Sequence, residues 1–169
     1  MSSLLRPGLP AVSFAASLFL DDGARAVIGS VLTGAVPRAR RYVTRGLPGA
    51  DAFTGEELLL RHPGAEHLVI AGAGLSPQDR WWLRYPAGRV AVCEMPAGST
   101  RYDQNEKLAE AGAAMFGFPD WPETDPRSVT CATWQAIRAA RRRGTLAAWY
   151  CVRPPYGCLT ENESLTALR

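Results

Sequence analysis

Apolar runs alternate with amphipathic, helix-like segments along most of this chain. The clearest unit spans residues 113–152: an apolar run (113–118), a loop rich in Pro and Asp, a helical pattern (128–143) and a second apolar run (146–152). A strand, a helix and a strand in this order predict a βαβ unit, which requires a parallel sheet. Ligands of such sheets bind at the carboxyl ends of the strands, so the pattern predicts the place of a site before its chemistry.

The rest of the chain repeats this alternation. Four more apolar runs are predicted to be strands, at residues 11–17, 41–44, 67–72 and 89–94. Helical patterns follow Asp22 and Asp51, and another follows the loop at 95–107. Together they predict an α/β fold, with a mainly parallel sheet of about five to six strands flanked by helices.

Two adjacent tryptophans, Trp81 and Trp82, follow the Ser76-Pro77 start of a short predicted helix. Neighbouring residues of one helix cannot both face inward. One tryptophan is therefore expected over a flat edge of the core, or at the rim of a pocket or on a partner surface.

The chain has 169 residues, of which 47% are hydrophobic and 21% charged, a mixture typical of one globular domain. That domain is predicted at residues 11–152, with a leader at 1–10 and a polar tail at 153–169. No segment approaches the ~18 continuous apolar residues of a membrane span, so no membrane partner is expected. The run at 9–20 has no convincing cleavage site after it, and we predict a cytoplasmic protein.

The four cysteines form no CxxC pair, and both histidines are far from them in sequence. Buried, reduced thiols are the default for such a pattern, and no metal or other cofactor is expected. The chain also has no GxSxG, HExxH or Walker motif.

The formal net charge is only +3, but arginines gather in two clusters. The clusters are Arg38, Arg40, Arg41 and Arg45, and Arg138, Arg141, Arg142 and Arg143. Guanidinium groups suit bidentate phosphate recognition, although solvated faces of a chain that uses Arg in place of Lys would show the same clusters. A modest net charge does not favour a dedicated nucleic-acid binder.

Several polar segments are predicted to meet at the carboxyl edge of the sheet. The turn at 46–51 (GLPGAD) either holds phosphate on free backbone amides or only turns the chain, with Asp51 capping the next helix. Other segments predicted at this edge supply Arg101, Asp103 and Asn105, then Asp120 and Trp121, then Ser128, Thr130 and Thr133. The last three lie near a helix start, where hydroxyls and orphan N–H groups can take a phosphate or a ribose.

These motifs in this order resemble the SLOG superfamily, Rossmann-like three-layer domains related to the DNA-processing protein DprA, the YspA and YpsA proteins and the LOG phosphoribohydrolases. The resemblance covers most of residues 11–152. It implies a nucleotide or nucleotide derivative bound over two helix starts, the first carrying Gly46, Gly49 and Asp51 and the second residues 128–133. Of the second motif Thr133 and Trp134 keep the pattern, while Asn105 matches the usual Arg-Asn pair and Arg101 is a possible substitute for its arginine.

We therefore expect a nucleotide-type small molecule as ligand of a sensor or binding domain. The predicted ligand contacts are Arg45, Gly46, Gly49, Asp51, Arg101, Asn105, Trp121, Ser128, Thr130, Thr133 and Trp134. An alternative is a hydrolase or transferase acting on an N-glycosidic bond; Gln135 stands where LOG enzymes have an acid, so Asp103, Glu106 and Asp120 are the candidate catalytic carboxylates.

A second alternative is a DprA-like nucleic-acid-binding module that uses the arginine clusters. A homodimer is also conceivable from the sequence, through an exposed tryptophan of the pair at 81–82 or through an edge strand at 146–152.

Overall fold

The computed structural model describes residues 9–154 and 159–161. Its strands are β1 (Leu9–Ala16), β2 (Ala39–Arg45), β3 (Glu66–Ala71), β4 (Ala91–Glu94), β5 (Ala114–Phe118), β6 (Leu146–Tyr150) and β7 (Leu159–Glu161). Its helices are α1 (Asp22–Gly34), α2 (Ala50–Arg61), α3 (Arg101–Ala111) and α4 (Ala132–Arg143), with 3₁₀ turns η2 (Pro77–Asp79), η3 (Trp81–Arg84) and η4 (Pro126–Val129).

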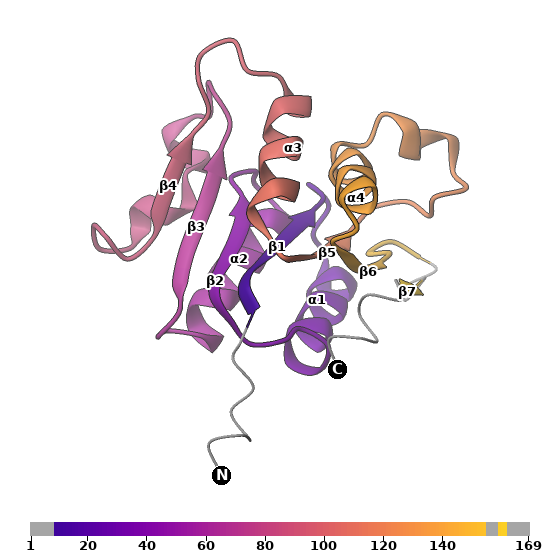
Figure 1. Cartoon of the computed structure of the whole chain (residues 1–169), viewed down its shortest axis with the longest axis horizontal. Helices are drawn as coiled ribbons and strands as arrows, with labels where there is room; N and C mark the ends of the chain where they lie inside the picture. The colour runs from indigo at the N-terminus through magenta and orange to yellow at the C-terminus, as the bar shows by residue number, and fades with distance from the viewer. Residues whose placement is uncertain (1–8, 155–158, 162–169) are drawn as a thin grey trace.

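One sheet joins all seven strands in the order β4-β3-β2-β1-β5-β6-β7 (Figure 1). Strands β1 to β6 are parallel and β7 runs antiparallel to β6. The chain moves outward from β1 to β4 on one side and resumes at β5 on the other side of β1. The strand order therefore reverses between β1 and β5, which is where ligands of open α/β sheets bind.

Helices cover both faces of this sheet, so the domain is a Rossmann-like three-layer sandwich, as the alternating pattern predicts. Strand β1 shows the alternation that separates the two faces. Val12 and Phe14 pack in a cluster with residues of α1 and α2, whereas Ala11 and Ala15 pack in a second cluster with residues of α3 and α4. Trp134 of α4 is buried in this second cluster.

Both tryptophans of the predicted helix are buried: Trp81 is 4% exposed and Trp82 is 6% exposed. They pack in a cluster with Val69 and Ala71 of β3, which agrees with the expected position over an edge of the core and not with an exposed pocket rim or partner surface. They lie on the 3₁₀ turn η3, where two glycines leave room for their rings. A Cβ atom on Gly55 would lie 2.4 Å from Trp81, and one on Gly46 would lie 3.1 Å from Trp82.

The predicted edge strand at 146–152 is not an edge. Strand β6 ends at Tyr150, and β7 pairs with it from within the segment predicted to be a tail. The two features that suggested a homodimer, a free edge here and an exposed tryptophan, are therefore both missing from the described residues.

The ends of the predicted domain also shift. Strand β1 begins at Leu9, inside the predicted leader, and the rest of that leader (1–8) lies outside the described residues, as do 155–158 and 162–169 of the tail. The helix predicted at 128–143 starts at Ala132, because residues 126–129 form the separate turn η4. Among the helices described here, none combines the length and apolarity needed to cross a membrane.

Candidate functional site

A pocket of about 350 Å³ opens at the point where the strand order reverses. The segments after β1, β2 and β5 line it, together with the starts of α3 and α4. Its lining residues are Ala16, Ser17, Leu18, Arg45, Leu47, Arg101, Asp120, Trp121, Arg127, Thr130, Cys131, Ala132 and Thr133. We call this space the switch-point pocket.

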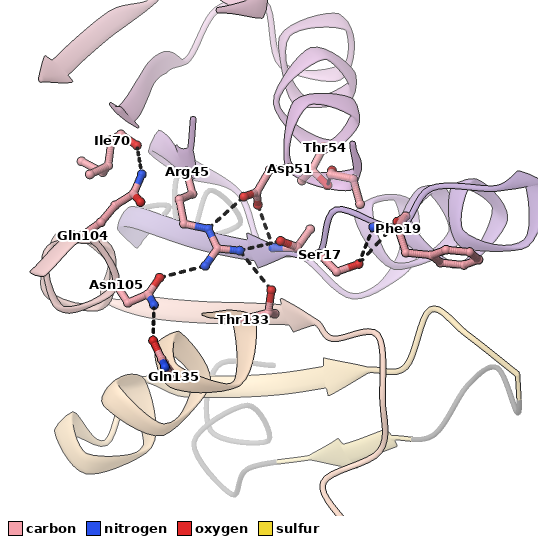
Figure 2. A network of polar contacts seen from close by, with 12 residues as sticks. Ser17, Phe19, Arg45, Asp51, Thr54, Ile70, Gln104, Asn105, Thr133 and Gln135 are labelled. Atoms are coloured by element: carbon pink, nitrogen blue, oxygen red, sulfur yellow. Dashed lines mark hydrogen bonds and ion pairs between the residues drawn. The ribbon is translucent and has the colours of Figure 1, made fainter. Parts of the chain in front are cut away.

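A buried arginine lies at the base of the switch-point pocket. Arg45, the last residue of β2, is 1% exposed, and its guanidinium donates in three directions (Figure 2). Nε donates to Oδ2 of Asp51 at 2.8 Å, and Nη1 donates to Oδ1 of Asn105 at 2.8 Å. Nη2 donates to the Ala16 carbonyl and, at 3.0 Å, to Oγ1 of Thr133.

The same contacts connect five segments of the fold. Oδ1 of Asp51 accepts the Ala16 amide at 2.8 Å, and Nδ2 of Asn105 donates to Oε1 of Gln135 at 3.2 Å. The carboxyl ends of β1 and β2 are thereby bonded to α2, α3 and α4. We call Arg45, Asp51, Asn105, Thr133 and Gln135 the Arg45 network.

Electrostatics and burial act in opposite directions on Asp51. Burial raises the pKa of its carboxyl to about 6, and the adjacent Arg45 guanidinium together with the Ala16 amide limits that rise. At neutral pH the carboxyl is ionised and forms a buried ion pair with Arg45.

The turn before α2 brings Asp51 to this position. Gly49 has φ +79°, and a Cβ atom there would lie 2.1 Å from the Leu18 carbonyl oxygen, so only glycine fits. The Ala50 amide donates to the Ser17 carbonyl at 3.1 Å. Two backbone contacts therefore hold the start of α2 against the segment after β1.

The start of α4 faces the switch-point pocket. Cys131 is its N-cap residue and makes no side-chain capping hydrogen bond. The first amides of a helix have no intrahelical acceptor and carry the positive end of the helix dipole. Because Cys131, Ala132 and Thr133 line the pocket, this positive end lies at its wall.

Three arginines and one carboxylate supply the charged groups of the lining. Arg45 pairs with Asp51 inside the network, and Arg127 pairs with Asp125. Hydrogen bonds from the side chain and the backbone amide of Arg127 lower the pKa of the Asp125 carboxyl to about 2. Within residues 9–154, Arg101 is exposed and has no carboxylate partner. Asp120 is partly buried, with Arg153 Nε 3.8 Å from its Oδ1.

The ring of Trp121 already carries two cations. The Cζ atom of Arg127 lies 3.5 Å from its centroid, and that of Arg153 lies 4.3 Å from it. Arg153 also lies over Phe19, so it connects the segments that follow β1 and β5. A base that stacked on Trp121 would have to displace one of these guanidinium groups.

The structure brings many of the predicted contact residues together, in two groups. Arg45, Arg101, Trp121, Thr130 and Thr133 line the switch-point pocket. The side chains of Arg45 and Thr133 also belong to the buried network, as do those of Asp51 and Asn105, which do not line the pocket.

The remaining predicted contacts have other surroundings. Gly46 lies against Trp82, and Gly49 forms the turn before α2. Ser128 donates its hydroxyl to the Glu123 carbonyl, and the buried Trp134 donates Nε1 to the Trp121 carbonyl.

Of the three candidate catalytic carboxylates, only Asp120 lines the switch-point pocket. Asp103 forms a capping box with Thr100 at the start of α3. Glu106 forms ion pairs with Arg142 and Arg143.

Sequence reasoning missed three residues of this pocket, Ser17, Leu18 and Arg127, and placed Leu47 and Cys131 within the two predicted motifs without naming them as contacts. A signal for Ser17 and Leu18 was present, since Ser17 ends the strand predicted at 11–17 and Leu18 follows it, so both belong at its carboxyl edge. Arg127 carried no such signal, because its place depends on how the loop after β5 folds.

The two arginine clusters differ in how many members are paired. Arg141 pairs with Glu123, and Arg142 and Arg143 pair with Glu106. In the first cluster, Arg45 is buried and Arg41 pairs with Glu66. Surface ion pairs of this kind neutralise much of the positive field that a nucleic-acid surface would need.

Among the described residues, no group of three or more His, Cys, Asp and Glu side chains is placed to hold a metal ion. Comparison of the chain with protein-family models, with curated proteins and with solved structures found no match. The Rossmann-like class rests on the strand order and layers described above, and the resemblance to the SLOG superfamily stays a prediction.

Proposed function

We propose that this protein binds a nucleotide or a nucleotide-derived phosphorylated ligand in the switch-point pocket, as a sensor or binding domain. One observation carries the proposal: the pocket combines the uncapped start of α4 with Arg101, a cation that has no carboxylate partner within residues 9–154. An anion with several acceptor oxygens satisfies both features at once.

A phosphate group is the anion that suits these donors. The amides at the start of α4 bind its oxygens, and the Arg101 guanidinium approaches from the start of α3. The Thr133 hydroxyl accepts from Arg45 and keeps its own proton for a ligand oxygen. The Arg45 network holds Thr133 in this orientation, so the phosphate site is rigid before the ligand arrives.

The rest of a nucleotide needs apolar surface for its base. Leu18 and Leu47 line the pocket beside the phosphate donors, and Leu18 is 56% exposed. The volume of about 350 Å³ falls in the range of small-molecule sites, roughly 300–1,000 Å³. A nucleotide therefore suits both the size and the lining of this pocket.

Calorimetric titration with AMP, GMP, CMP and UMP tests the proposal. We expect at least one of them to bind, and Arg101→Gln to weaken that binding roughly 10- to 100-fold, because a charge-assisted hydrogen bond contributes about 1.5–3 kcal/mol. Arg40→Gln is the matched control, since Arg40 is an exposed arginine of β2 that does not line the pocket. Absence of binding for all four, or equal losses in both variants, would refute the proposal.

A second candidate function is hydrolysis of a nucleotide N-glycosidic bond, which the position of Asp120 favours. Its carboxylate lines the switch-point pocket and is 16% exposed, so it can reach a bound ribose or activate water. Gln135 is no substitute for the missing acid, because it is bonded to Asn105 and has no proton to exchange.

Release of free base from the same four nucleotides, followed by chromatography, tests this second candidate. We expect Asp120→Asn to abolish release and Glu106→Gln to leave it unchanged, since Glu106 is paired with arginines outside the pocket. Binding without any release in the wild-type protein would leave the binding function and exclude hydrolysis.

A further inference from the structure

A second cavity, of about 200 Å³, lies at the carboxyl ends of β3 and β4. It shares two lining residues with the switch-point pocket, Leu47 and Arg101. The switch-point pocket is lined by the segments after β2, β1 and β5, which are the next strands along the sheet. The two cavities are therefore neighbours along the carboxyl edge of the sheet, and Arg101 lines both of them.

The second cavity is lined by neutral polar residues and by four apolar ones, Leu47, Ala73, Leu75 and Met95. The hydroxyls of Ser99 and Thr100 and the backbone of residues 72–74 contribute to it. Gln104 also lines it, and its side chain is fixed because Nε2 donates to the Ile70 carbonyl at 3.0 Å. No charged residue besides Arg101 lines this cavity. A sugar suits such a mixed lining, because Ser99, Thr100 and Gln104 can bond its hydroxyls and the apolar side chains can contact its C–H groups.

Arg101 belongs to both cavities and differs from the other arginines of the switch-point pocket. Arg45 and Arg127 each have a carboxylate partner, whereas Arg101 has none within residues 9–154. A ligand that carried negative charge at the boundary between the cavities would supply this partner. A nucleoside monophosphate ends in the first cavity, so it leaves the second one without a ligand group.

We propose that the ligand is a nucleotide extended through its phosphate, namely a nucleoside diphosphate whose terminal phosphate carries a sugar or a second nucleoside. This inference rests on the proposed nucleotide-binding function. The nucleotide part occupies the switch-point pocket, with its phosphate at the start of α4. The diphosphate passes Arg101, and the second sugar enters the cavity lined by Ser99 and Gln104.

Matched ligand series test this inference by calorimetry. Each series holds a nucleoside monophosphate, the corresponding diphosphate and a diphosphate sugar: AMP, ADP and ADP-glucose; UMP, UDP and UDP-glucose; GMP, GDP and GDP-mannose; and CMP, CDP and CDP-glucose. In one series we expect the diphosphate sugar to bind at least tenfold more tightly than both shorter members.

Two tryptophan variants test whether the tighter binding of the diphosphate sugar depends on the second cavity. Ala73 is exposed and lines the second cavity, so Ala73→Trp fills that cavity without disturbing the core. We expect this variant to bind the diphosphate sugar no more tightly than the diphosphate, with monophosphate binding unchanged. Ala97→Trp, on an exposed loop residue that does not line the cavity, is the control and should keep the full gain.

The outcomes separate this inference from the function on which it rests. Equal binding of all three members of a series, or a gain that Ala73→Trp does not reduce, would overturn the extended ligand and leave nucleotide binding intact. A gain already complete at the diphosphate would likewise overturn the role of the second cavity. No binding by any of the compounds would overturn both proposals.

Discussion

The Arg45–Asp51 ion pair is the contact whose removal has the largest expected effect on stability. Both side chains are 1% exposed, and Arg45 also donates to Asn105, Thr133 and the Ala16 carbonyl. The substitution Arg45→Met keeps most of the side-chain volume but leaves the Asp51 carboxylate buried without its cation. Breaking such a pair costs about 3–5 kcal/mol, a large part of the roughly 5–15 kcal/mol that holds a domain folded.

A double-mutant cycle at pH 7 separates the ion pair from the loss of packing. Urea unfolding followed by circular dichroism should show Arg45→Met destabilised by about 3–5 kcal/mol. Adding Asp51→Asn should recover about 2 kcal/mol, because the asparagine is neutral and its Oδ1 still accepts the Ala16 amide. A loss below about 1 kcal/mol in Arg45→Met, or no recovery in the double variant, would refute a buried ion pair here.

The pH dependence of the same pair follows from the pKa of Asp51. Burial raises this pKa from 3.8 to about 6, so between these values the folded chain binds more protons than the unfolded chain. The stability that proton binding to Asp51 contributes is therefore complete below about pH 4 and is lost as the pH rises through about 6. The unfolding free energy of the wild type, relative to Asp51→Asn, should fall over that interval and stay constant above it; a rise would contradict the raised pKa.

Two further predictions concern the turn before α2 and the pocket wall. In urea unfolding, Gly49→Ala should destabilise the domain by about 3 kcal/mol or more, because the new Cβ would lie 2.1 Å from the Leu18 carbonyl oxygen. Gly34→Ala is the control and should be neutral or slightly stabilising, because a Cβ there would have no atom within 4 Å. Iodoacetamide should label the half-buried Cys131 faster than the buried Cys151, and a bound nucleotide should slow the labelling of Cys131. Mass spectrometry measures both rates. If a ligand known to bind did not protect Cys131, that ligand would bind elsewhere.

Much of the fold follows from local pattern. Side-chain periodicity predicts the type of three elements: the strands β5 and β6 from their apolar runs, and the helix α4 from its amphipathic pattern. This periodicity depends only on neighbours in sequence. Their alternation requires parallel strands, and parallel strands place Arg101, Trp121 and Thr133 at one edge. The position of these three residues at the pocket could therefore be predicted from the sequence.

Residue type and position, however, do not reveal which polar groups satisfy one another. Arg45 and Asp51 are six residues apart and were both expected to contact a ligand, but the packing of α3 and α4 against β1 and β2 buries them as an ion pair. The burial of Trp82 likewise depends on tertiary packing, because its ring lies beside Gly46 in a cluster with Val69 and Ala71 of β3.

The sequence by itself determined most of the secondary structure, the parallel sheet and the edge at which a ligand is expected to bind, because periodicity and chain connectivity are local properties. Only the tertiary structure decided the strand order, the pairing of β7 with β6, and the division of the polar residues between a buried network and an open pocket. These depend on contacts between segments far apart in the chain, such as Arg45 with Thr133, whose geometry no local pattern encodes.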